Sequence, residues 1–283
     1  MTRVSFSQVI KNANIDIRRE YERLYGLFCL QRVIIGNGQD TTLRDTCAYS
    51  FSNLPFRGTC ISLDDFDDYY GYHFEKVPSG FDLDYLVSFC EYTYNLAIHN
   101  QRPGYGGFAL SSVNQAMQFY IMQTMKVIES IGYMANTHNW VTDFVPKDQI
   151  AIAVAEIIDP GLSYKVIEYN HHSMKGNMSR KKDVLLALAD KLEPQRPKLK
   201  QINCTFESDL FFLFNSANLR HNNTDPAGNT KYISYVASLS SDELEKWYDD
   251  IYQMCLLAFL ELDHTERKER INQFKKEISS KKS

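Results

Sequence analysis

Apolar side chains recur at intervals of three and four along most of this chain, the spacing of a helix with one buried face. The first such segment runs from Ile15 to Val33. A short acidic helix is predicted after Ser62-Leu-Asp-Asp65, which has the form of an N-terminal capping box. Residues 41–59 are rich in aromatic side chains but have no period. We therefore assign residues 1–78 to an N-terminal region of uncertain structure.

Two long helices are predicted after the breaker Val77-Pro-Ser-Gly80. Apolar residues follow a helical spacing from Phe81 to Asn100 and again from about Ser112 to Thr137. The segment Arg102-Pro-Gly-Tyr-Gly-Gly107 is typical of a loop. Because this connection is short, the two helices are expected to form an antiparallel pair.

The middle of the chain is predicted to hold three shorter helices. Between Asn139 and Asp159 the pattern is ambiguous, since Ile150 to Ile158 alternates as a strand would. Pro146 followed by Lys-Asp-Gln suits a helix start, and we favour a helix. Two further helices are predicted over Ser163 to His172 and Lys182 to Leu192.

The last third contains the clearest helical pattern. A helix capped by Thr205 is predicted to bury a face that continues to Ala217. Ser240-Ser-Asp-Glu243 is a second capping box, and a final helix follows from about Glu266. Between them, one seam for packing against another helix consists of Leu244, Tyr248, Ile251, Cys255, Ala258 and Leu262. The expected fold is mainly α, an antiparallel helical bundle with an N-terminal, mostly helical extension.

Composition narrows the class of protein. Of 283 residues, 44% are hydrophobic and 23% charged, as in ordinary globular proteins. A net charge of −4 disfavours a protein that coats nucleic acid along its whole surface. The six cysteines form no Cys-x-x-Cys pair, which disfavours a disulfide framework or a zinc knuckle. With no secretory leader and no 18-residue apolar run, we expect a cytoplasmic protein without membrane contact.

Charge is unevenly distributed. Residues 175–200 carry eight Lys or Arg against three acids, residues 265–283 carry seven against three, and residues 61–75 are acidic. The first of these runs supplies candidate phosphate contacts at Lys175, Arg180, Lys181 and Lys182. Such fields can orient an anionic ligand or a partner subunit, but each run is also what a solvated helix face contains.

A polar cluster follows the face of the Thr205 helix. The next positions on that face are Arg220 and His221, accompanied by Asn215, Asn218, Asn222 and Asn223. Arginine suits phosphate, and histidine exchanges a proton near neutral pH. RNA cleavage by the neighbouring 2′-hydroxyl needs this combination and no metal. The alternative is a helix C-terminus stabilised by cationic side chains, with asparagines as caps.

The segments Leu213-Phe-Asn-Ser-Ala-Asn-Leu-Arg-His-Asn-Asn-Thr-Asp225 and Leu239 to Met254 resemble the HEPN superfamily. The resemblance implies an all-α bundle, often dimeric, in which two copies of the motif face each other. Active members are metal-independent ribonucleases of phage-defence and toxin–antitoxin systems, whereas inactive members are binding or assembly modules. Asn215 and Arg220 match the family motif. The family's histidine four to six residues beyond the arginine is absent, and His221 is adjacent instead.

Two hypotheses follow for residues 79–283 as a HEPN-like domain. In the first, a homodimer binds and cleaves RNA in a bacterial defence system, with Arg220 and His221 as catalytic residues and the four asparagines orienting them. In the second, the domain is a non-catalytic assembly or sensing module that engages a partner protein. Neither needs a cofactor, and the spacing of His99, His138 and His171 does not require a metal. A small-molecule enzyme with a site in a helical cavity is a third possibility.

Overall fold

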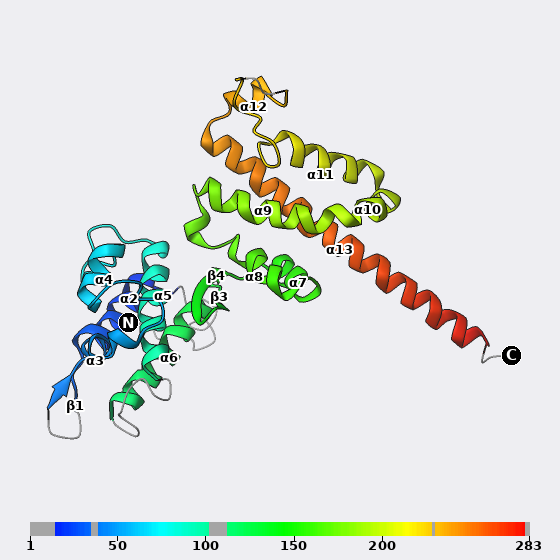
Figure 1. The fold of residues 1–283 in the computed structure, drawn as a ribbon. Helices are drawn as coiled ribbons and strands as arrows, with labels where there is room; N and C mark the ends of the chain where they lie inside the picture. The colour runs from blue at the N-terminus through cyan, green and yellow to red at the C-terminus, as the bar shows by residue number, and fades with distance from the viewer. Residues whose placement is uncertain (1–14, 35–38, 102–111, 228–229, 281–283) are drawn as a thin grey trace, which may run out of the picture. The chain divides into compact units, whose positions relative to one another are not determined.

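The computed structural model describes residues 15–34, 39–101, 112–227 and 230–280 (Figure 1). Helices dominate and the described strands form two small pairs, so the mainly α prediction is confirmed. The predicted loop at residues 102–107 lies outside the described residues. The chain divides into two compact units, residues 1–144 and 145–283. This division falls within the second strand pair, whereas the sequence pattern predicts a boundary after residue 78.

Unit 1 (residues 1–144) is built on α5 and α6, which pack against each other and against α2 and α3. A π-helical turn, Gly26–Leu30, continues α2. The elements of this unit are α2 (Ile17–Tyr25), β1 (Val33–Ile34), β2 (Asp40–Thr41), α3 (Leu43–Tyr49), α4 (Leu63–Tyr70), α5 (Leu83–Asn100), α6 (Ser112–Ser130), β3 (Tyr133–His138) and β4 (Val141–Pro146).

The start of α4 follows the predicted capping pattern in part. The Ser62 hydroxyl accepts a hydrogen bond from the Asp65 N–H at 3.1 Å. The Asp65 carboxylate, however, accepts from the N–H of Ile61 rather than from that of Ser62. A complete capping box, which the sequence did not suggest, stands at the start of α3, between Thr42 and Asp45.

Aromatic side chains form the core of unit 1. Tyr21, Phe28, Phe89 and Tyr120 are fully or almost fully buried, and the rings of Tyr21 and Phe89 lie 4.9 Å apart. The Tyr120 hydroxyl donates to Thr93 Oγ1 at 2.6 Å, so this buried polar group is satisfied. The rings therefore fill the interior and supply part of its hydrogen bonding.

The prediction of one helix from Ser112 to Thr137 is wrong at its end. Helix α6 stops at Ser130, and residues 133–146 form the strands β3 and β4. Gly132 has a φ of 82°, and Asn139 and Trp140, which connect the strands, have φ values of 47° and 71°. Two residues with positive φ match the turn of a two-residue hairpin, which reverses the chain. The helix predicted over residues 139–159 is therefore confirmed only for α7.

Unit 2 (residues 145–283) packs several helices around one long helix, α13. Helices α9, α10, α11 and α7 all contact α13. The elements are α7 (Gln149–Ile157), α8 (Pro160–Glu168), α9 (Met178–Leu192), α10 (Arg196–Ile202), α11 (Cys204–Ser216), α12 (Ser234–Ser238) and α13 (Ser241–Ser280). No helix in the described ranges has the length and apolarity that crossing a bilayer requires.

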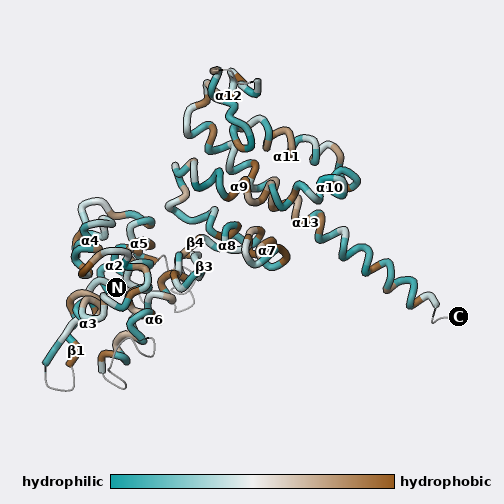
Figure 2. The backbone as a smooth tube through the Cα atoms, in the orientation of Figure 1, coloured by the Kyte–Doolittle hydropathy of each residue, from teal (hydrophilic) through white to brown (hydrophobic). Residues whose placement is uncertain are grey.

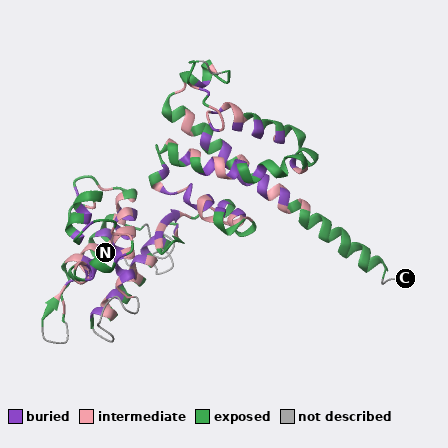
Figure 3. Cartoon of the chain, viewed as in Figure 1, coloured by how far each residue is buried: buried purple, intermediate pink, exposed green. Residues whose placement is uncertain are grey.

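Helix α13 has two different halves. It begins at the predicted capping box, where Ser240 and Glu243 exchange hydrogen bonds. The predicted seam is buried from Tyr248 to Leu262, with Leu244 half-buried at its start. Beyond Thr265 every described residue is exposed (Figure 3). This end is largely hydrophilic, with isolated apolar residues (Figure 2). The helix therefore packs along its first half and continues into solvent along its second.

Candidate functional site

The guanidinium of Arg220 is directed at neighbouring parts of unit 2. Its Nη1 lies 2.5 Å from Glu193 Oε2, and its Nη2 donates to the Ala189 carbonyl at 3.3 Å. The same group lies 5.1 Å from the centre of the Phe214 ring. Arg220 therefore joins α11 to the C-terminal end of α9. An arginine engaged in this way has fewer donors left for a phosphate.

A turn after α11 determines this direction. The helix ends at Ser216, two residues before Asn218, which has a φ of 57°. Asparagine tolerates this left-handed conformation better than most residues. The backbone N–H of Arg220 then donates to the Phe214 carbonyl at 3.1 Å. The prediction that the helical face continues to Arg220 and His221 is wrong, because the chain leaves the helix four residues earlier than Arg220.

The asparagines maintain the loop that follows. The N–H of Asn218 donates to the Asn223 side chain at 2.8 Å, and the N–H of Asn223 donates to the Asn218 side chain at 3.1 Å. Asn223 is 1% exposed and donates to the Lys231 carbonyl at 2.7 Å. Asn222 accepts from two N–H groups that follow it, and Asn215 donates to a carbonyl of its own helix. These contacts match the capping alternative.

His221 is half-buried, and no hydrogen bond joins it to Arg220 in the described part of the chain. The structure thus brings Arg220, Asn218, Asn222 and Asn223 to one loop, leaves Asn215 within α11, and does not pair the arginine with the histidine. An acid–base role for His221 remains a prediction.

Two of the four predicted phosphate contacts are engaged in ion pairs. Lys181 is 5% exposed, and its Nζ lies 2.8 Å from Glu245 and 2.6 Å from Asp249. Arg180 pairs with Glu168. Lys175 is exposed and Lys182 half-buried. The basic run therefore contributes interhelical pairs within unit 2 as well as solvent-facing charge.

Unit 2 has an apolar groove that the sequence did not reveal. Its volume is about 260 Å³, and it lies among α11, α12 and the first turns of α13. The groove, as we call it below, is lined by Phe212, Leu213, Ser216, Ala217, Ile233, Tyr235, Val236, Leu239, Leu244 and Trp247. Phe212 is 65% exposed and Tyr235 is 62% exposed. Two large rings are therefore left in solvent at the edge of an apolar hollow.

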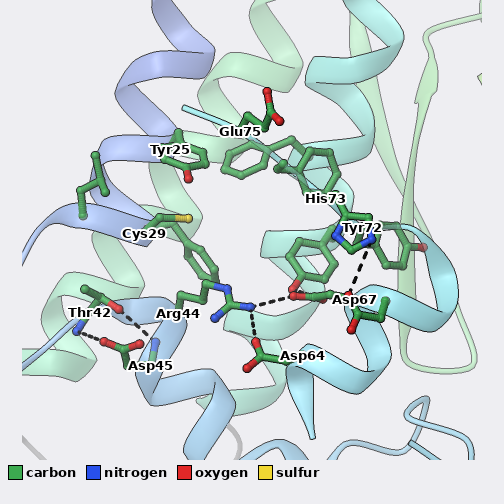
Figure 4. Close-up of a pocket in the computed structure, with 16 residues that line it drawn as sticks. Tyr25, Cys29, Thr42, Arg44, Asp45, Asp64, Asp67, Tyr72, His73 and Glu75 are labelled. Atoms are coloured by element: carbon green, nitrogen blue, oxygen red, sulfur yellow. Dashed lines mark hydrogen bonds and ion pairs between the residues drawn. The ribbon is translucent and has the colours of Figure 1, made fainter. Parts of the chain in front are cut away.

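Unit 1 has a larger pocket, shown in Figure 4, of about 510 Å³. Residues from α2, α3, α4 and α5 and from the segment after α4 line it. Arg44 is its central cation, and Nη2 donates to Asp64 at 2.7 Å and to Asp67 at 2.8 Å. The Tyr92 hydroxyl donates to the other oxygen of Asp67 at 2.5 Å. These bonds hold the charged groups in fixed positions.

Burial shifts the pKa values of two groups that line this pocket. Burial raises the pKa of Asp67 above its usual value, although hydrogen bonds from Tyr92 and Arg44 oppose the shift. Burial also raises the pKa of the Cys29 thiol to about 12, so this thiol is not a nucleophile at neutral pH. The charged groups at the Arg44 end of the pocket are therefore bonded to one another.

The pocket was missed because its members are distant in sequence. Arg44, Asp67 and Tyr92 come from three helices, and the aperiodic aromatic segment before Ser62 gave no indication of their contacts. The acidic run at residues 61–75 was the available signal, and four of its members line the pocket: Asp64, Asp67, Asp68 and Glu75.

Comparison with known proteins gives no match. No family model matches the chain, and neither a curated protein nor a solved structure is significantly similar to it.

Proposed function

We propose that this chain is a non-catalytic helical assembly module that forms a homodimer through α13 and the groove. The observation that carries the proposal is an apolar stripe on the exposed end of α13. Ile271, Phe274 and Ile278 are 51%, 63% and 42% exposed. Their spacing of three and four residues places them on one face of the helix.

The stripe and the groove have matching chemistry. Amphipathic helices bind apolar grooves through residues at positions i, i+3 and i+7, which is the spacing of the stripe. The groove presents the exposed rings of Phe212 and Tyr235, which a helix would cover. Burying such rings in an interface supplies most of its hydrophobic stabilisation.

The stripe that fills the groove has to come from the α13 of another molecule. Trp247 in the groove and Phe274 in the stripe belong to one continuous helix. They are 27 residues apart, which corresponds to about 40 Å along a helix. A straight helix does not fold back on itself, so the stripe does not reach the groove of its own chain. A second copy of the chain presents the same stripe without this restriction.

Charge favours the same pairing. Residues 203–250, which include the groove, contain eight acidic and three basic residues. Residues 265–283 contain seven basic and three acidic residues. Opposite local charges steer association and disfavour wrong partners. Reciprocal exchange of the two helix ends would fill both grooves and close a dimer.

The oligomeric state tests the proposal directly. Light scattering coupled to size-exclusion chromatography should give the mass of a dimer for the wild type. Phe274→Glu in the stripe and Phe212→Glu in the groove should each give a monomer, because either change buries a charge in an apolar contact. Gln273→Glu adds the same charge one position away, off the stripe, and should remain dimeric.

A monomeric wild type would overturn the proposal. So would a metal-free preparation that cleaves RNA and loses this activity in His221→Ala while its helical circular dichroism stays unchanged. Equal inertness of wild type and Arg220→Ala toward RNA is expected.

A further inference from the structure

The charges of the unit 1 pocket are unequal. Five carboxylates, one guanidinium and one imidazole line it. Arg44 bonds to only two of the carboxylates, those of Asp64 and Asp67. The side chain of Asp68 is 79% exposed, and Glu75 is also exposed. A hollow lined mainly by one sign of charge attracts the opposite sign, so this pocket repels anions.

The aromatic rings that line the pocket are a second, independent source of negative potential. Tyr72, Phe74 and Tyr92 form an aromatic cluster, in which the ring of Tyr92 stacks on that of Tyr72 with centres 4.9 Å apart and lies 5.5 Å from that of Phe74. Phe89, which is 1% exposed, lies 5.2 Å from Phe74 and 6.0 Å from Tyr25 and supports this cluster from the core. Aromatic faces are negative and attract ammonium groups, most strongly when water is excluded.

The arrangement of the pocket favours an organic ion over a metal ion. In the described part of the chain, no three carboxylate, imidazole or thiol groups of this pocket converge on one point as metal ligands would. Asp67, which is 7% exposed, is already bonded to Arg44 and Tyr92. A volume of about 510 Å³ is within the range of small-molecule sites.

We propose that the unit 1 pocket binds a small organic cation, either a quaternary ammonium or a protonated amine. The cation lies against the faces of Tyr72, Phe74 and Tyr92. In Figure 4, Glu75 and Tyr25 lie at one end of the pocket and Arg44 with its two aspartates at the other. The cationic group therefore belongs at the Glu75 end, away from the guanidinium.

Two matched probes test the sign of the charge. Choline and 3,3-dimethyl-1-butanol have the same branched shape, and only choline is charged. Isothermal titration calorimetry of the full chain should show choline binding at least about tenfold more tightly than the alcohol. Inorganic phosphate should not bind. Equal affinity for choline and the alcohol, binding of phosphate at this pocket, or absence of choline binding at millimolar concentration would each overturn the proposal.

Substitutions locate the site. Tyr72→Leu keeps an apolar side chain but removes the ring, and choline affinity should fall by about tenfold. Asp68→Asn changes an exposed side chain, so the variant should fold as the wild type does. It should weaken choline binding by about threefold at low salt and by less at high salt. Glu129→Gln removes the same charge on α6, outside the pocket, and should leave affinity unchanged. Loss of affinity in Glu129→Gln equal to that in Asp68→Asn would show a non-specific charge effect and contradict the proposal.

Discussion

The two units stabilise their interiors with different polar contacts. In the aromatic core of unit 1, buried tyrosines donate neutral hydrogen bonds, such as Tyr120 to Thr93 and Tyr21 to the Glu75 carbonyl, whereas the ion pairs of Arg44 stand at the pocket. Unit 2 joins its helices through ion pairs, among them Lys181 with Glu245 and Arg220 with Glu193. Neutral bonds do not respond to acid, whereas ion pairs lose one partner when a carboxylate is protonated. The two units should therefore respond differently to mutation and pH.

The largest expected effect comes from breaking the central ion pair of unit 2. Lys181→Met should destabilise unit 2 by about 3 kcal/mol, because in the described part of the chain it leaves the mostly buried Glu245 carboxylate with the Gly176 N–H as its hydrogen-bond partner. Hydrogen–deuterium exchange followed by mass spectrometry measures this loss in peptides of α9, while peptides of α5 report unit 1. Lys182→Met, at a half-buried neighbouring position, is the control and should change little. Equal losses in the two variants would contradict an ion-pair origin.

A smaller effect is expected in unit 1. Tyr120→Phe removes one buried hydrogen bond, and Thr93 keeps its bond to the Phe89 carbonyl. The free energy of unfolding of unit 1 should fall by about 1 kcal/mol. Urea denaturation and exchange in α5 peptides measure it. Tyr49→Phe, at a residue that is 86% exposed, should have no effect. A loss confined to α9 peptides would be inconsistent with this assignment.

The smallest expected effect concerns pH. Burial raises the pKa of Glu245, but hydrogen bonds from Lys181 and from the Gly176 N–H together lower it by more than burial raises it. The pKa of Glu245 therefore lies below its usual value. Ionised Glu245 therefore stabilises the folded state fully above the pKa of about 4.5 that it has in the unfolded chain. This stabilisation is lost as the pH falls through the lower pKa that it has in the folded chain. The pKa of Asp67 in unit 1 is raised by burial, so acid favours the folded state there.

Acidification from pH 6 to pH 4 should consequently weaken α9 protection more than α5 protection. The difference between wild type and Glu245→Gln should shrink over the same interval. A constant difference between these two proteins would show that Glu245 does not titrate as its contacts require.

Local patterns predicted the helices better than their ends. The sequence predicted the capping box at Ser240 and the seam of α13, because a helix start and a buried helical face each depend on residues close together in sequence. The end of α6 was missed because Met134 continues the helical spacing. The positive φ values of Asn139 and Trp140 set the hairpin there instead, and tryptophan gives little indication of such a turn.

The sites depended on contacts between distant segments. The sequence placed Arg220 near the end of an apolar helix, but not beside Glu193 and Ala189, which belong to the end of α9 and the residues after it. The turn at Asn218 decides this direction, and one asparagine does not specify it in advance. The unit 1 pocket and the groove of unit 2 are likewise products of packing rather than of a motif.

The uninterrupted course of α13 has a consequence for the entropy of binding. An isolated helix of 15 residues is marginal in water, mainly because its first turn is costly to form. The end of α13 needs no such nucleus, since its packed first half already supplies hydrogen-bonded turns from which it extends. A molecule that binds at Phe274 therefore binds a helix that is already formed, so α13 loses little backbone conformational entropy on binding.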